Sequence, residues 1–181
     1  MHAETRDPAS TPASAPADGD RRLSLAWRAL AAVDDPEIPA LSIVDLGLIR
    51  SVEVASNGTL EVGLSPTYLG CPATEVIRGS VEHALGNAGI GAFAVISVLS
   101  PAWTSDWITA EGRRKLESYG IVPPERSTAS LREILHPHRA VGCPRCRSTD
   151  TECLSEFGST PCKALHRCRA CLEPFEYFKC I

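Results

Sequence analysis

The sequence predicts an α+β fold, in which a small mixed domain is followed by a compact module held together by cysteines. Three observations indicate this arrangement. Several segments carry apolar residues three and four positions apart, as on one face of a helix. Two alternating segments flank an Asn-Gly pair, which is typical of a β-hairpin. Two Cys-x2-Cys pairs stand near the C-terminus, where they favour a bound metal.

The mixed domain is expected over residues 21–124 and begins with a helix and a hairpin. The helix ends at Pro36, because proline disfavours helical backbone in the residue before it. The apolar face that predicts this helix consists of Leu23, Ala26, Trp27, Leu30 and Val33. Residues 48–54 and 59–64 alternate apolar and polar side chains around Asn57-Gly58, which supplies the positive φ angles of a tight turn. We therefore expect two antiparallel strands here.

A helix, a strand and another helix are expected to complete this domain. Residues 73–87 carry one apolar stripe, formed by Val76, Ile77, Val81, Ala84 and Leu85. The short apolar run at 92–99 suits a buried strand. Because it follows a helical crossover, this strand should lie parallel to a hairpin strand and form a three-stranded mixed sheet. Residues 109–119 predict a last helix, which Gly120 ends.

The remaining segments fall outside this domain. Residues 1–20 are rich in Ala, Pro, Ser, Thr and Asp without an apolar period, so we expect a disordered tail. Residues 125–140 mix charges, His and Pro, and we interpret them as a linker. Residues 141–181 contain both Cys-x2-Cys pairs. The sequence thus predicts two folded parts joined by a short connector.

The module at 141–181 has the cysteine spacing of a zinc ribbon. Its four predicted ligands are Cys143, Cys146, Cys168 and Cys171. Two such pairs place four thiolates at tetrahedral corners, and four protein ligands leave no position for water, so the site should stabilise the module without catalysing a reaction. An iron centre on the same four sulfurs is the alternative, because soft thiolates accept both metals.

Composition restricts the classes of function. The 181 residues have a net charge of -4 and a pI near 5.7, which gives no reason to expect binding to nucleic acid. No run of eighteen apolar residues and no signal peptide is present, so we expect a soluble, cytoplasmic protein that does not bind membranes. In a reducing cytosol the eight cysteines are interpreted as thiols and metal ligands.

Cys71 is the best candidate for reactivity in the mixed domain. Pro72 suits the first position of the following helix, which would place Cys71 at the N-cap, beside unsatisfied N–H groups and the positive end of the helix dipole. That position favours a thiolate, which can serve as a metal ligand or a nucleophile. The alternative is a small buried residue chosen for packing.

Two acidic residues precede it. Glu37 lies between Pro36 and Pro39, which fix its direction, although most acids in turns are merely solvated. Asp45 follows Ser42 by three residues, as in a capping box, which would give Asp45 a purely structural role.

These segments resemble a known family. The motifs that carry the resemblance are Asp35-Pro36-Glu37-Ile38-Pro39, Val44-Asp45-Leu46-Gly47-Leu48-Ile49, Ser65-Pro66-Thr67, Gly70-Cys71-Pro72-Ala73-Thr74 and Trp103-Thr104-Ser105-Asp106-Trp107. They are similar to the SufT-like iron-sulfur assembly domains. Joined to a four-cysteine ribbon whose tail runs Glu173-Pro174-Phe175-Glu176-Tyr177-Phe178-Lys179-Cys180, they resemble the D subunits of the phenylacetyl-CoA epoxidase system.

The resemblance implies an accessory protein of aerobic phenylacetate degradation, which is not itself an enzyme. Its partners would be the oxygenase and reductase subunits of the epoxidase and, further, iron-sulfur assembly proteins. The family's site positions fall on Glu37, Asp45, Thr67 and Cys71. These residues would bind iron or an iron-sulfur cluster transiently. One thiolate cannot complete a cluster site, so a homodimer, Cys162 or Cys180 would supply further ligands.

Two other interpretations stay open. The chain could be an adaptor that docks on the oxygenase or reductase through its ribbon without transferring metal. A thiol enzyme that uses Cys71 as nucleophile would need a positioned base, and the nearest candidate, His83, lies three turns further along the helix.

Overall fold

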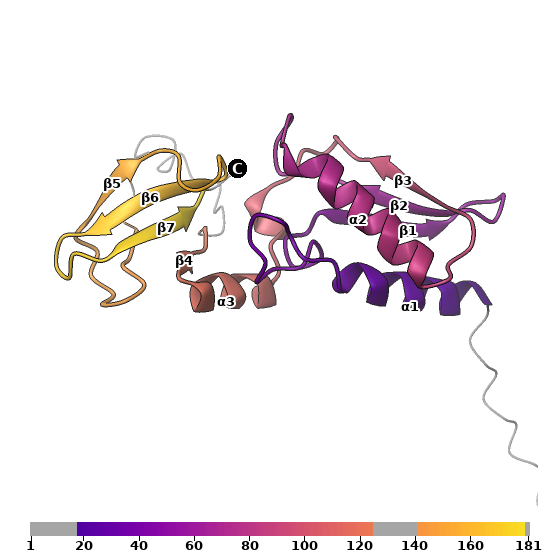
Figure 1. Cartoon of the computed structure of the whole chain (residues 1–181), viewed down its shortest axis with the longest axis horizontal. Helices are drawn as coiled ribbons and strands as arrows, with labels where there is room; N and C mark the ends of the chain where they lie inside the picture. The colour runs from indigo at the N-terminus through magenta and orange to yellow at the C-terminus, as the bar shows by residue number, and fades with distance from the viewer. Residues whose placement is uncertain (1–17, 125–140, 180–181) are drawn as a thin grey trace, which may run out of the picture.

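Two β-sheets lie at opposite ends of an elongated molecule, with α3 and its flanking loops between them (Figure 1). The computed structural model describes residues 18–124 and 141–179. The first sheet contains β1 (Ile49–Val54), β2 (Leu60–Leu64) and β3 (Phe93–Ser97) in that order. β1 and β2 are antiparallel, and β3 is parallel to β2. The α+β class and the three-stranded mixed sheet are confirmed.

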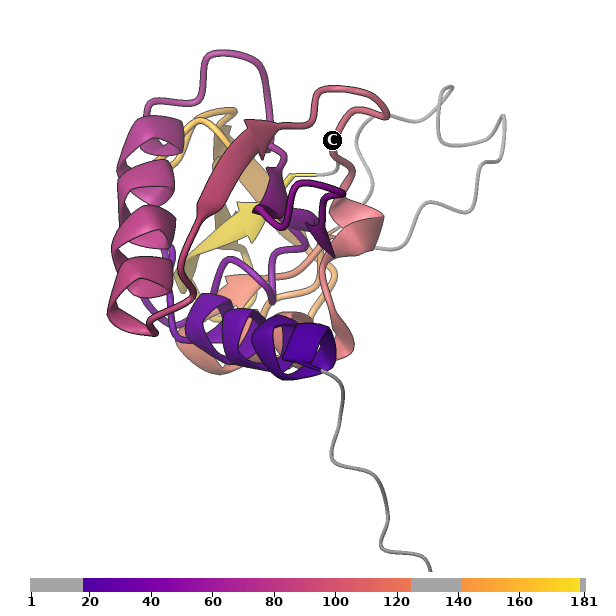
Figure 2. The same cartoon turned by 90° about the vertical axis from the view of Figure 1, so that its right-hand side faces the viewer.

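Helices cover one face of this sheet. They are α1 (Asp18–Ala31) and α2 (Ala73–Asn87); α3 (Ala110–Tyr119) follows a 3-10 turn, η1 (Ser105–Trp107). In the end view of Figure 2, α2 lies beside the strands and α1 below them. Helix α1 begins inside the segment that we expected to be disordered, so the predicted tail is three residues too long. Asp20 favours the earlier start, because an acid in the first turn interacts well with the helix dipole.

The strand after α2 differs from its prediction. None of its residues is fully buried: β3 is an edge strand with Phe93 and Val95 half-buried toward the helices and Ile96 exposed on the other face. An apolar run does not distinguish a central strand from an edge strand. Arg78 of α2 donates to the Val95 carbonyl at 2.7 Å and so covers part of this edge.

The second sheet has the order β4-β7-β6-β5. Three of its strands belong to the ribbon, β5 (Thr151–Ser155), β6 (Lys163–Cys168) and β7 (Pro174–Phe178). The fourth, β4 (Ile121–Val122), follows α3 directly and pairs in parallel with β7. β4 lies within residues 21–124, the range predicted for the first domain, yet it pairs with the ribbon. The mixed domain therefore contributes a strand to the ribbon sheet. The predicted linker lies outside the described residues.

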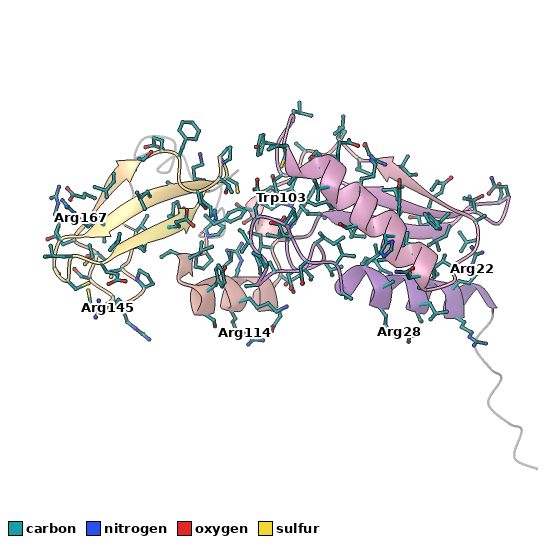
Figure 3. All side chains as sticks on the ribbon, in the orientation of Figure 1. Arg22, Arg28, Trp103, Arg114, Arg145 and Arg167 are labelled. Atoms are coloured by element: carbon teal, nitrogen blue, oxygen red, sulfur yellow. The ribbon has the colours of Figure 1, made fainter. Side chains whose placement is uncertain are left out.

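The apolar core of the first domain extends into the ribbon. Phe178 and Cys162, both from the ribbon, are buried in that core at 1% and 6% exposure. Trp103, labelled in Figure 3 between the two sheets, packs against Phe178 with ring centroids 6.2 Å apart. Its indole N–H donates to the Leu46 carbonyl at 2.9 Å. Phe175 faces the other way, into a small core with Cys143 and Cys168.

Candidate functional site

The ribbon gathers four sulfur atoms at one point. The Sγ atoms of Cys143, Cys146, Cys168 and Cys171 all lie within 4.8 Å of one another. The closest pairs, Cys143 with Cys171 and Cys146 with Cys168, are 3.6 and 3.5 Å apart. A tetrahedral zinc with bonds of about 2.3 Å separates its sulfur ligands by about 3.8 Å. The two closest pairs are near this value, so the four cysteines could hold a structural zinc.

The ionisation of the ribbon thiols also favours a bound metal. Although burial opposes ionisation, the N–H groups of Cys146 and Arg145 lower the pKa of Cys143 to about 7. The Glu173 N–H lowers the pKa of Cys171, but burial and the other three sulfurs outweigh it and raise the pKa of that thiol to about 12. Four thiolates this close repel one another, and a divalent cation removes that cost.

A second candidate site is a narrow pocket where the ribbon meets the first domain. Its volume is about 20 Å³. The polar and sulfur-bearing side chains around it are Asp35, Glu37, Ser65, Thr67, Cys71, Thr74 and Cys162, and its floor is apolar, with Leu48, Ile77 and Phe178 among others. Three of the four residues indicated by the resemblance, Glu37, Thr67 and Cys71, thus come together with Cys162 from the ribbon.

Cys71 lies at the start of α2. The assigned helix begins at Ala73 with Pro72 as its cap, although the Pro72 backbone, with φ -65° and ψ -25°, is already helical, as predicted for the first helical position. The Cys71 carbonyl accepts from the Thr74 N–H at 3.2 Å. The side chain is half-buried and borders the pocket. Burial raises the pKa of Tyr68, and the neighbouring Cys71 raises it further through its charge and a side-chain hydrogen bond. The Tyr68 phenol therefore lies beside the Cys71 sulfur.

Glu37 is positioned by the turn that contains it. The Asp35 carboxylate accepts the N–H groups of Glu37 and Ile38 at 2.9 and 2.8 Å, which fixes the backbone between the two prolines. Burial raises the pKa of Asp35, and burial together with Asp35 raises the pKa of Glu37. Two carboxyl groups close together in a partly dry pocket are expected to attract a cation.

Cys162 enters the pocket from the ribbon. It is 6% exposed, its Sγ lies 4.0 Å from Oε2 of Glu37, and the hydroxyl of Thr160 is 3.0 Å away. Burial raises the pKa of the Cys162 thiol. The next residue, Lys163, is 3% exposed and pairs with Glu176 at 3.1 Å. Lysine is rarely buried without a partner, and Glu176 is the partner that permits its burial here.

Asp45 lies apart from the pocket. Its Oδ2 accepts the N–H and hydroxyl of Ser42 at 3.1 and 2.9 Å, and the Ser42 hydroxyl accepts the Asp45 N–H in return. Lys115 donates to it at 2.6 Å. Burial opposes ionisation, but the hydrogen bonds from Lys115 and Ser42 outweigh it and lower the pKa of Asp45. This is the structural role that the capping box predicted.

Among the described residues, one further cysteine, Cys153, lies outside both sites. Cys153 is exposed and approaches only Glu156, at 3.7 Å, among the described residues. Cys180 lies outside the described residues, so its predicted role as a ligand stays a prediction. On the ribbon surface Arg145 pairs with Glu173, while Arg167 and Arg169 both pair with Glu152. These ion pairs neutralise the cations that a phosphate backbone would need.

Sequence reasoning missed three polar residues of the pocket environment. Asp35 belongs to one of the family-like motifs without being a predicted site residue, yet its carboxylate holds the turn that orients Glu37. Tyr68 precedes Cys71 by three residues, and that spacing could have indicated proximity. Ser65 is 1% exposed, and its hydroxyl has no partner among the described residues. Nothing in the sequence signals that burial.

Comparisons with known proteins agree with both parts of the chain. Residues 26–98 match the model of an iron-sulfur cluster assembly protein family, and residues 127–179 match that of the PaaD zinc beta ribbon domain. The chain is 47% identical over 155 residues to the putative D subunit of the 1,2-phenylacetyl-CoA epoxidase from Escherichia coli (strain K12), covering 86% of this chain and 91% of that relative. The chain belongs to the PaaD family.

Two further similarities concern the first domain of this PaaD family member. It is 36% identical over 78 residues to "Fe-S protein maturation auxiliary factor SufT" from Staphylococcus aureus (strain USA300), covering 42% of this chain and 88% of that one. A crystal structure of a domain of unknown function, DUF59, from Bacillus anthracis is similar with a TM-score of 0.50 and 26% identity, covering 54% of this chain and 93% of that one. These findings support an accessory role in iron-sulfur assembly.

No helix among the described residues is long and apolar enough to cross a membrane.

Proposed function

We propose that this protein helps mature the multicomponent phenylacetyl-CoA epoxidase by handling iron or an iron-sulfur cluster at the pocket beside Cys71. The observation that carries the proposal is the convergence of Cys71, Glu37 and Thr67 on one pocket. Thr67 and Cys71 lie in the loop between β2 and α2, and Glu37 lies in the turn after α1, all within the domain that matches the iron-sulfur assembly family. The chain would receive iron and deliver it to a client protein of the epoxidase without oxidising the substrate.

The pocket has the chemistry that transient delivery needs. A thiol and a carboxylate are ligands for iron, and here they lie at an opening instead of inside a closed four-ligand sphere. Cys71 is half-buried, so a partner protein can reach it. Leu69, which is 78% exposed in the same loop, gives such a partner an apolar contact next to the sulfur.

Replacing Cys71 by Ser tests this function. In cells that lack their own PaaD protein, we expect the wild-type chain to restore epoxidase activity and the iron content of the client proteins, and C71S to restore neither. Cys153→Ser is the matched control, because Cys153 is exposed and belongs to neither sulfur site. Full restoration by C71S would refute the proposal, provided that both variants accumulate equally.

A second candidate function is that of an adaptor that docks on the oxygenase or reductase through the ribbon. One observation favours it: the ribbon exposes Leu154, Phe157 and Leu172 by 47%, 66% and 69%. Exposed large apolar side chains are candidates for a protein contact. An adaptor predicts that C71S leaves maturation intact while substitutions of these three residues abolish it, so the same cellular assay separates the two functions.

A further inference from the structure

We propose that the pocket takes up a single divalent transition-metal ion, iron(II) in its cellular role, through Cys71, Cys162 and Glu37. The site is therefore shared by the two parts of the chain, and the ribbon supplies one of its thiolates. This inference rests on the function proposed above and names the form of its cargo.

Donor atoms from the two parts of the chain lie close together. Sγ of Cys162, in the ribbon, lies 4.0 Å from Oε2 of Glu37, in the first domain. This separation is smaller than about 4.4 Å, the sum of typical thiolate and carboxylate bonds to a zinc-sized ion. One ion can therefore bind both atoms without a change of the backbone. Cys71 borders the same pocket and supplies the third donor.

The size of the pocket also favours a single ion. The pocket has a volume of about 20 Å³, and a cavity needs roughly 10–15 Å³ to hold one water molecule. It accommodates one ion, or one ion with a bound water. An assembled cluster of four irons and four sulfides is several times larger than this space. The size of the pocket therefore favours a single ion.

The pocket lining contains a buried polar group without a hydrogen-bond partner among the described residues. The hydroxyl of Ser65 is buried in the pocket lining and finds no hydrogen-bond partner among the described residues. A buried hydroxyl without a partner costs about 1–3 kcal/mol. A water molecule or an ion in the pocket would satisfy it. Thr67, which also lines the pocket, can stabilise the same water.

The looseness of the donors explains why the ion would be cargo and not a resident cofactor. Across residues 18–124 and 141–179, the ribbon cysteines form the one group of three or more candidate ligands whose atoms lie within 4.8 Å of one another. Cys71, Cys162 and Glu37 do not form such a group, so side chains must rotate to close on an ion. Opening them again releases it.

The charge around the pocket is compatible with a cation. Lys163 is buried next to Cys162, and an uncompensated ammonium there would repel an ion. Glu176 pairs with it at 3.1 Å and removes that repulsion. Asp35 adds a further carboxylate to the lining, and its Oδ1 accepts the two N–H groups that hold the turn of Glu37.

Cobalt(II) is the probe for this site, because its absorption reports thiolate ligands. The full-length protein is first loaded with one equivalent of zinc, which the preformed ribbon site takes and which cobalt does not displace, since zinc binds such sites more tightly. We expect one further equivalent of cobalt to bind with a thiolate charge-transfer band. Cys71→Ser, Cys162→Ala and Glu37→Gln should each weaken it by at least about tenfold, and Cys153→Ser should not.

The outcomes separate this inference from the proposed function. If C162A binds cobalt like the wild type while C71S does not, the shared site is refuted and the function of Cys71 stands. If anaerobic loading with iron(II) and sulfide yields four irons with equal sulfide per chain, the single-ion cargo is refuted and cluster handling stands. If no variant changes cobalt binding, the pocket binds no metal. Glu37→Gln lies outside the core, so it tests the site even if C162A folds poorly.

Discussion

Removing the ring of Phe178 should destabilise the first domain, although this residue belongs to the ribbon. Phe178 is 1% exposed and packs in the first domain's core, with its ring 6.2 Å from that of Trp103. Replacing a buried phenylalanine by alanine typically costs about 3–5 kcal/mol, because apolar contacts are lost and a cavity remains. Domains of this size are stable by only about 5–15 kcal/mol. F178A should therefore lose about a fifth or more of the folding free energy.

Tryptophan fluorescence measures this effect: denaturant unfolding gives the loss of unfolding free energy, and heating gives the shift of the thermal midpoint. All three tryptophans, Trp27, Trp103 and Trp107, lie in the first domain, so the signal reports that domain alone. With about 2–4 °C per kcal/mol for a chain of this length, the thermal midpoint should fall by about 6–20 °C. The control is Phe157→Ala, an exposed phenylalanine of the same ribbon, which should cost less than about 0.5 kcal/mol.

An F178A transition, monitored by tryptophan fluorescence, at the same midpoint as that of the wild type would contradict this role of Phe178. That result would mean that the ribbon folds and docks independently, so the first domain gains nothing from Phe178. The pocket beside Cys71 would then lose its fixed wall, since Phe178 lines it.

Two further predictions concern the first domain. Gly47 has φ +69°, and a Cβ there would stand 2.5 Å from the Trp107 carbonyl oxygen, whereas Gly58 has φ +81° but open space around it. Gly47→Ala should therefore destabilise the domain by more than Gly58→Ala. Equal losses in unfolding free energy for the two variants would contradict this. The pKa of Asp45 is lower in the folded protein than the value of about 3.9 in the unfolded chain, so the ionised carboxylate stabilises the fold. This contribution is complete above the unfolded pKa and is lost as the pH falls through the lower folded pKa. The gap in unfolding free energy between wild type and Asp45→Asn should therefore shrink below about pH 4, and a gap that does not change with pH would argue against an ionised Asp45.

Sequence predicted the features that depend on local chemistry. Asn57-Gly58 marked the first hairpin, the apolar stripe bounded α2 at 73–87, and Gly120 ended α3 with φ +87°. The spacing of the ribbon cysteines also sufficed, because each pair forms a local turn. These signals depend on residues a few positions apart, so no knowledge of the tertiary structure was needed.

The missed features depend on how the two parts dock. Cys162 had two open interpretations, ligand or packing under the ribbon, and its burial in the first domain's core follows only from the contact between Phe178 and Trp103. Lysine is normally a surface residue, and the burial of Lys163 depends on its ion pair with Glu176 from another strand. Likewise β3 could not be recognised as an edge, since strand order is not encoded in the strand's own residues.

The two sulfur sites follow opposite physical designs, and the ribbon links them. Its four-cysteine centre is preorganised, so a metal there stabilises the ribbon and stays. The stabilised ribbon in turn holds Cys162 and Phe178 against the first domain. The SufT relative matches this chain over 88% of its own length, and the remainder is much shorter than residues 141–179. Such a domain has no ribbon to supply a second thiol, so in this chain the structural metal site is what completes the pocket where the transient one is proposed.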